Sequence, residues 1–152
     1  MHQNLTDILG MVPKKYHDKI IYISMDSAAL FDGWTVRINP VECKRDEDRP
    51  FVVQSYMHLT ESFHGRYWGP RVAVVIRNLV NTLVYLDNYK HTDLLKILTD
   101  EKFRQYVLTK VPLKHVKEFW ENIYPQKMAA EATGTAYNKL DEIVTTPNIA
   151  LI

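Results

Sequence analysis

The chain has 152 residues, of which 46% are hydrophobic and 24% are charged, as in a single globular domain that buries its own core. Its 19 Lys and Arg residues against 18 Asp and Glu residues give a formal net charge of +1, which excludes the basic excess of a dedicated DNA-binding module. The single cysteine, Cys43, excludes an intrachain disulfide, and no apolar run reaches the roughly 20 residues of a membrane helix. We therefore expect a cytoplasmic protein without direct membrane insertion, which could still join a membrane complex through a partner.

The first 49 residues have the pattern of a partial α/β unit. Residues 5–11 fit a short helix, because turn-forming residues follow them closely. Residues 19–24 are β-branched and aromatic, and residues 34–38 alternate apolar with polar side chains, so each segment is predicted as a strand. The mixed charge run at 44–49 is typical of a solvated loop and marks the boundary between the predicted domains 1–49 and 50–152.

The strongest helical pattern in the chain begins at the Trp68-Gly69-Pro70-Arg71 segment. Apolar residues then recur three and four positions apart, at Val72, Val75, Ile76, Leu79, Val80, Leu83 and Leu86. A helix that begins at Pro50 precedes this one. Its expected inward face carries Phe51, Val52, Ser55, Tyr56 and Leu59.

Four further helices are expected toward the C-terminus. In chain order, the first is capped by Thr92 with Asp93 and runs through Leu98, and the second is capped by Asp100 and runs through Val107. The third starts at Pro112 and is interrupted at Pro125, and the fourth runs from about residue 126 to residue 144. Gly134 lies inside the last helix and costs about 1 kcal/mol relative to alanine, so a bend or a later start stays open. The predicted fold class is mainly α, an irregular bundle of five or six helices with one or two N-terminal β-strands.

Several short segments, in this order, carry a resemblance to a known family. They are residues 5–9 with 12–13, 18–23, 38–41 (with Val41 in place of the usual leucine), 68–71 (Trp-Gly-Pro-Arg), 94–103, 119–120 (Phe-Trp), and 138–140 with 147–149. Together they resemble the HerA-like and TraG-like ATPases, hexameric DNA translocases that include the coupling proteins of conjugation and type IV secretion. The resemblance implies a slice of the RecA-like core followed by the helical insertion, which in the family engages DNA or the protein that delivers it.

The motifs that handle nucleotide in that family are missing from this sequence. None of the 5 glycines belongs to a G-x-x-x-x-G-K-[ST] loop, and no apolar strand ends in the Asp-Glu pair that orders magnesium. We therefore expect no catalysis and no cofactor in this chain, although the full-length family uses ATP and Mg²⁺. Core strands without their sheet neighbours would expose unpaired edges, so we also expect self-association.

Five basic side chains are the candidate DNA contacts. They are Lys110, Lys114, His115, Lys117 and Lys127. Such a cluster could neutralise phosphates and release their counterions. The alternative is a solvated helix face, which the nearby Glu118 and Glu121 favour.

Four aromatic residues are the candidate contacts for a protein partner. They are Tyr56, Phe63, Tyr67 and Trp68. Aromatic side chains are frequent anchors of interfaces, and a relaxase, an accessory protein or a neighbouring subunit would be the partner. The alternative is that these rings fill the core. For Trp68 in particular, Gly69 and Pro70 suit a tight turn into the next helix, and this needs no ligand.

One histidine pattern could suggest a metal site. His58, Glu61 and His64 are spaced three apart, whereas the usual zinc helix places two histidines four apart with the acid between them. The match is poor and no fourth ligand is evident. We therefore predict no metal site.

Overall fold

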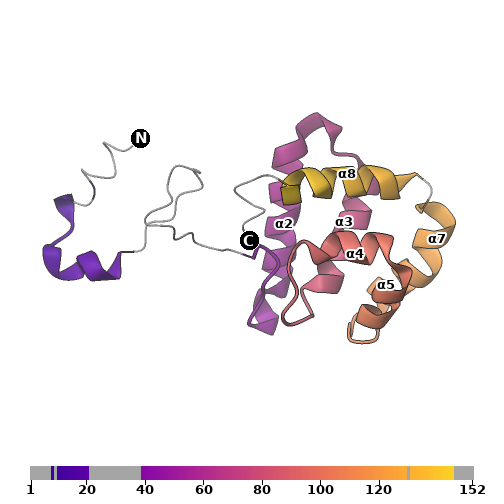
Figure 1. Cartoon of the computed structure of the whole chain (residues 1–152), viewed down its shortest axis with the longest axis horizontal. Helices are drawn as coiled ribbons and strands as arrows, with labels where there is room; N and C mark the ends of the chain where they lie inside the picture. Colours follow the sequence, from indigo (N-terminus) through magenta and orange to yellow (C-terminus); the bar gives the residue numbers. More distant parts are fainter. Residues whose placement is uncertain (1–7, 9, 21–38, 130, 146–152) are drawn as a thin grey trace. The chain divides into compact units, whose positions relative to one another are not determined.

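The computed structural model describes residues 8, 10–20, 39–129 and 131–145 (Figure 1). By internal packing the chain divides into two units, Met1–Val36 and Arg37–Ile152. The predicted strand at 34–38 lies outside the described residues, as does most of the strand at 19–24. Of the latter, Lys19 is helical and Ile20 is extended, so a strand does not begin at Lys19.

The described part of the first unit is a short helical segment. Ile8, Gly10 and Met11 are helical, in agreement with the helix predicted at 5–11. The 3-10 helix η1 (Lys14–Lys19) follows, and none of its residues is buried. The His17 ring donates from Nε2 to the carbonyl oxygen of Val12 at 2.8 Å, which closes the turn between the two helical pieces.

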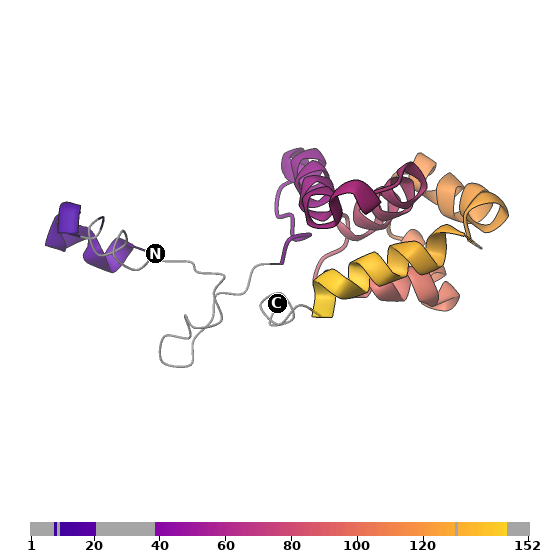
Figure 2. The same ribbon diagram turned by 90° about the horizontal axis from the view of Figure 1, so that it is seen from above.

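The second unit is a bundle of helices, and the mainly α fold predicted from the sequence is confirmed. Seven α-helices lie in its described part: α2 (Arg49–His64), α3 (Pro70–Leu83), α4 (Asp93–Thr99), α5 (Glu101–Leu108), α6 (Lys114–Glu118), α7 (Tyr124–Lys127) and α8 (Ala132–Thr145). Helix α3 packs against α2, α4, α6 and α8, and α8 also packs against α4. Figure 2 shows the same helices from above.

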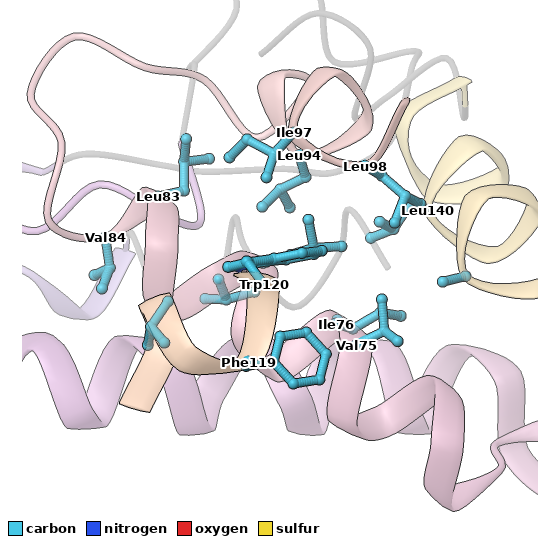
Figure 3. Close-up of a cluster of buried hydrophobic side chains, with 14 of the residues drawn as sticks. Val75, Ile76, Leu83, Val84, Leu94, Ile97, Leu98, Phe119, Trp120 and Leu140 are labelled. Carbon is cyan, nitrogen blue, oxygen red and sulfur yellow. The ribbon is translucent and has the colours of Figure 1, made fainter. Parts of the chain in front are cut away.

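The apolar stripe predicted on α3 is confirmed. Its six residues within the helix are all buried: Val72, Val75, Ile76, Leu79, Val80 and Leu83. Leu86, beyond the helix, is half-buried. Figure 3 shows the indole ring of Trp120 in the middle of the cluster that this stripe forms with Leu94, Ile97 and Leu140. The spacing predicted the buried residues of α3 correctly because its apolar residues lie mainly on one side of the helix.

The buried face of α2 is not the one predicted. Its buried residues are Val53, Tyr56, Met57, Thr60 and His64. Of the predicted face only Tyr56 is buried, while Phe51 is 74% exposed and Leu59 is 43% exposed. Apolar residues occur on several sides of α2, so their spacing does not single out one face. The packing of α2 against α3 selects the face that is buried.

Helices α4 and α5 differ in how their N-termini are capped. The Asp100 carboxylate accepts a hydrogen bond from the backbone N–H of Phe103 at 3.0 Å, so the predicted cap of α5 is confirmed. The Thr92 side chain makes no capping bond at the start of α4. Instead the Asp93 carboxylate accepts from the backbone N–H of Lys90 at 2.9 Å, and this bond holds the preceding turn.

Residues 114–127 form one continuous helical run, in which a π-helix lies between two short α-helices. Helix α6 begins at Lys114, the π-helix η5 spans Phe119–Ile123, and α7 follows directly. Pro125 lies in the first turn of α7 and does not end the helical run as predicted. The wider π turn places Phe119, Trp120 and Tyr124 in mutual ring contact.

The last helix starts later than the predicted residue 126, since α8 begins at Ala132. Gly134 therefore lies in the first turn of this helix, where a flexible residue costs less than in the interior.

At the other end of the unit, residues before 50 belong to the bundle. Val41 is buried, and the Asn39 side chain donates to the carbonyl oxygen of Tyr89 at 2.8 Å. The bundle thus extends into the segment assigned from the sequence to the domain 1–49.

Candidate functional site

A shallow, open hollow lies where α2 ends. One wall is the C-terminal turn of α2 with the 3-10 helix η4 (Gly65–Tyr67), and the other is α8. The hollow is lined by Ser62, Phe63, His64, Gly65, Arg66, Tyr67, Thr135, Lys139 and Glu142. Gly65 has φ 52° and ψ −126°, a conformation that side-chain-bearing residues rarely adopt. This glycine lets the chain leave α2 sharply, and so keeps Phe63 and Tyr67 on the same rim.

Two of the four predicted partner-binding residues, Phe63 and Tyr67, line this hollow, and Trp68 lies next to His64 without lining it. Phe63 is 46% exposed and Tyr67 is 70% exposed, so both rings meet the solvent. Trp68 is half-buried against the core, and its ring is parallel to that of His64 at a centroid distance of 6.4 Å. Tyr56 is 1% exposed and belongs to the core. Its assignment as a partner contact was wrong, because α2 turns this side of the helix toward the bundle.

His64 holds the two walls together. Its Nε2 donates to the carbonyl oxygen of Lys139 in α8 at 3.1 Å, which fixes the hydrogen on that nitrogen. Its Nδ1 lies 3.7 Å from a carboxylate oxygen of Glu142. Burial, and then the charge of Lys139, lower the pKa of His64 against the opposing effects of the backbone bond and of Glu142. From the sequence alone, His64 is a candidate only for a metal site, because nothing local indicates a bond to a residue 75 positions away.

Two cations line the hollow, one on each wall. The Arg66 guanidinium lies over the Tyr67 ring, 5.1 Å from its centroid, and donates to the Tyr67 hydroxyl at 3.1 Å. Lys139 reaches the hollow from α8. Among the ion pairs between described residues, none involves Arg66 or Lys139. Within the described residues no carboxylate pairs with their charges, and the carboxylate of Glu142 faces His64.

The residue types at the hollow suggest a hydrolytic triad, but the geometry does not form one. Ser62, His64 and Glu142 supply a hydroxyl, an imidazole and a carboxylate. A triad histidine must accept the serine proton on one nitrogen while the other faces the acid. In His64 one nitrogen is bonded to the carbonyl of Lys139 and the other faces Glu142. Neither nitrogen is left to activate Ser62.

The predicted DNA-binding residues lie along α6 and its flanks. Lys114, His115 and Lys117 belong to one turn of α6, and Lys127 is the last residue of α7. Lys117 is half-buried and the others are exposed. Lys110, after α5, has its Nζ 4.6 Å from the centroid of the Tyr106 ring, and this partner raises the pKa of Lys110. The turn of α6 brings three of the five residues together.

The two histidines of the pattern on α2, His58 and His64, face different partners. The His58 ring is exposed and forms a hydrogen bond with the Gln54 side chain at 2.9 Å, whereas His64 points to α8. Among the described residues, no group of three His, Cys, Asp or Glu side chains is placed to hold an ion.

No protein-family model, curated protein or solved structure matches this chain. None of the described helices combines the length and the apolar character needed to cross a bilayer. The chemistry of the hollow and of α6 is therefore the basis on which a function is assigned. The hollow offers exposed aromatic rings beside two cations that pair with no carboxylate among the described residues, and α6 offers three basic side chains, of which Lys114 and His115 are exposed.

Proposed function

We propose that this chain is a non-catalytic recognition module, and that the hollow at the end of α2 docks a protein partner. The observation that carries the proposal is that two exposed aromatic rings, Phe63 and Tyr67, lie beside two cations, Arg66 and Lys139, which form no ion pair within the described part of the chain. Aromatic residues and arginine are the side chains most enriched at the energetic centres of interfaces. The bond from His64 to α8 holds this rim in place, which lowers the entropy lost on binding.

The resemblance to HerA-like and TraG-like ATPases supports a place for this module in a DNA-translocating assembly of the cytoplasm. There it would act as the helical insertion, while ATP and Mg²⁺ would be bound by other parts of the family's fold. The partner would be a relaxase, an accessory protein or a neighbouring copy of the chain.

Site-specific photo-crosslinking tests the proposal directly. A photoreactive phenylalanine analogue replaces Tyr67 in cells of the source organism, and Tyr106, which is 54% exposed on α5, is the matched control position. We expect a discrete protein adduct from position 67 that is lost when Phe63→Ala is added, and little adduct from position 106. Equal yields at both positions, or an adduct that is indifferent to Phe63→Ala, would contradict docking at the hollow.

DNA contact is the second candidate function, and the three basic side chains on one turn of α6 favour it. Binding of labelled single-stranded and duplex oligonucleotides should then weaken steeply as salt rises, because each neutralised phosphate releases counterions. The double variant Lys114→Glu with Lys117→Glu should abolish that binding. Docking at the hollow should instead respond to Tyr67→Ala and depend much less on salt.

A further inference from the structure

We infer that the segment that occupies the hollow is a short acidic peptide with one aromatic or aliphatic anchor side chain. This inference rests on the proposed docking function and adds the chemistry of the partner. It follows from the two cations and the two exposed rings that line the hollow.

The first step concerns charge. Arg66 and Lys139 line opposite walls, and neither forms an ion pair with another described residue. Glu142, the one acidic residue of the lining, faces the ring of His64. A partner with carboxylates could meet both cations, whereas a basic partner would meet two like charges. Complementary charge of this kind selects the partner and its orientation.

The second step concerns the anchor. Phe63 and Tyr67 are exposed on the rim, and the Phe63 ring packs nearly perpendicular to that of His64 at a centroid distance of 5.3 Å. An apolar side chain inserted beside these rings would remove apolar surface from water on both molecules. Arg66 lies on the Tyr67 ring, so its planar guanidinium is already oriented and can bind a carboxylate with two parallel N–H groups.

The third step separates a peptide from a nucleic acid. The lining holds the carboxylate of Glu142 beside the two cations, so the hollow offers no uninterrupted run of positive charge to a phosphate backbone. A peptide can place its carboxylates against Arg66 and Lys139 and keep an uncharged residue near Glu142. The mixed lining of two cations, one anion and two apolar rings therefore fits a peptide of mixed character better than a polyanion.

The experiment is a selection from a phage-displayed library of random peptides on the immobilised full chain. We expect enrichment of sequences with Asp or Glu next to Phe, Tyr, Trp or Leu. The double variant Arg66→Glu with Lys139→Glu should lose the acidic preference and weaken binding of the selected peptides about tenfold or more, as expected at an interface hot spot. Phe63→Ala should remove the preference for the anchor. Lys102→Glu, an exposed lysine on α5, is the matched charge control and should change neither preference.

Circular dichroism and thermal unfolding of each variant establish that the fold is retained, since the altered side chains lie on the surface of the hollow. Selected peptides that lack acidic residues, or that bind the Arg66→Glu/Lys139→Glu variant equally well, would overturn the inference. Displacement of the peptides by a single-stranded oligonucleotide at low concentration, or the absence of any enriched sequence, would also overturn it. If the adduct at position 67 persists while the acidic preference fails, only the inference falls and the docking function stands.

Discussion

The ring of His64 donates from Nε2 to the carbonyl oxygen of Lys139 at 3.1 Å, and this bond joins the end of α2 to the middle of α8. The ring is also parallel to that of Trp68 and edge-on to that of Phe63. A buried histidine thereby links a packing contact of the core with the exposed rim of the hollow.

Replacement of this ring should destabilise the fold. His64→Ala removes the hydrogen bond to the part-buried carbonyl of Lys139 and the aromatic contacts of a buried ring, so we expect a loss of about 1–3 kcal/mol in the free energy of unfolding. Urea denaturation measures this loss. His58→Ala, on the exposed side of the same helix, is the control and should change stability by no more than about 0.5 kcal/mol. A similar loss in both variants would contradict the role assigned to His64.

Acid should destabilise the protein through buried histidines. His91 is 1% exposed, and neither of its ring nitrogens has a hydrogen-bond partner among the described residues. Burial lowers the pKa of His91, and burial is also the first cause that lowers the pKa of His64. Because the unfolded state binds these protons more readily, the free energy of unfolding should fall as the pH drops below about 6.5, the ordinary histidine value.

Urea denaturation across this pH range, on the chain and on His91→Leu, measures the effect. Leucine fills a similar volume and cannot bind a proton, so part of the pH dependence should disappear, and the remainder should belong to His64 and other groups. An unchanged slope of stability against pH in His91→Leu would show that His91 does not supply this sensitivity.

A buried hydrogen bond fixes the tryptophan at the centre of the core. Trp120 donates from Nε1 to the Thr82 hydroxyl at 3.0 Å, and that hydroxyl donates to the carbonyl of Asn78 at 2.7 Å. Thr82→Val keeps the shape and leaves the indole N–H unpaired, so a cost of about 1–3 kcal/mol is expected in thermal or urea unfolding. Thr99→Val removes an equivalent bond to a backbone carbonyl at an exposed position and should cost much less.

The cap of α5 offers a further test at the surface. Asp100→Ala removes the bond from the carboxylate to the N–H of Phe103 and should cost about 1 kcal/mol. Thr92→Ala is its counterpart at α4, where the side chain makes no capping bond, and little change is expected. Equal changes in melting temperature for the two variants would show that the cap contributes nothing specific.

The elements with one clear apolar side could be predicted from the sequence. The spacing in α3 identified its buried residues, and Asp100 identified the start of α5, because both features depend on local geometry. The buried face of α2 could not be predicted in this way. Its apolar residues lie on several sides, and only the packing against α3 decides that Tyr56 is buried while Phe51 is exposed.

The hollow was predicted only in part. Clustering of aromatic residues in the sequence indicated Phe63, Tyr67 and Trp68, which the end of α2 does bring to one place. The second wall comes from α8, some 75 residues later, and no local pattern indicates that Lys139 and Glu142 would face His64. The π turn at Phe119–Ile123 was likewise not visible in the sequence, because the ring contacts that accompany it form only in the folded core.

Chemical-shift mapping on the isotope-labelled chain tests the docking surface most directly. The chain is titrated separately with a peptide obtained from the library selection and with a single-stranded oligonucleotide. We predict that the peptide shifts the backbone amides of residues 62–67 and 135–142 at sub-saturating concentration and leaves α6 unchanged. Shifts confined to α6 and its flanks, with the hollow unaffected by either probe, would contradict the claim that this protein acts by docking a partner between α2 and α8.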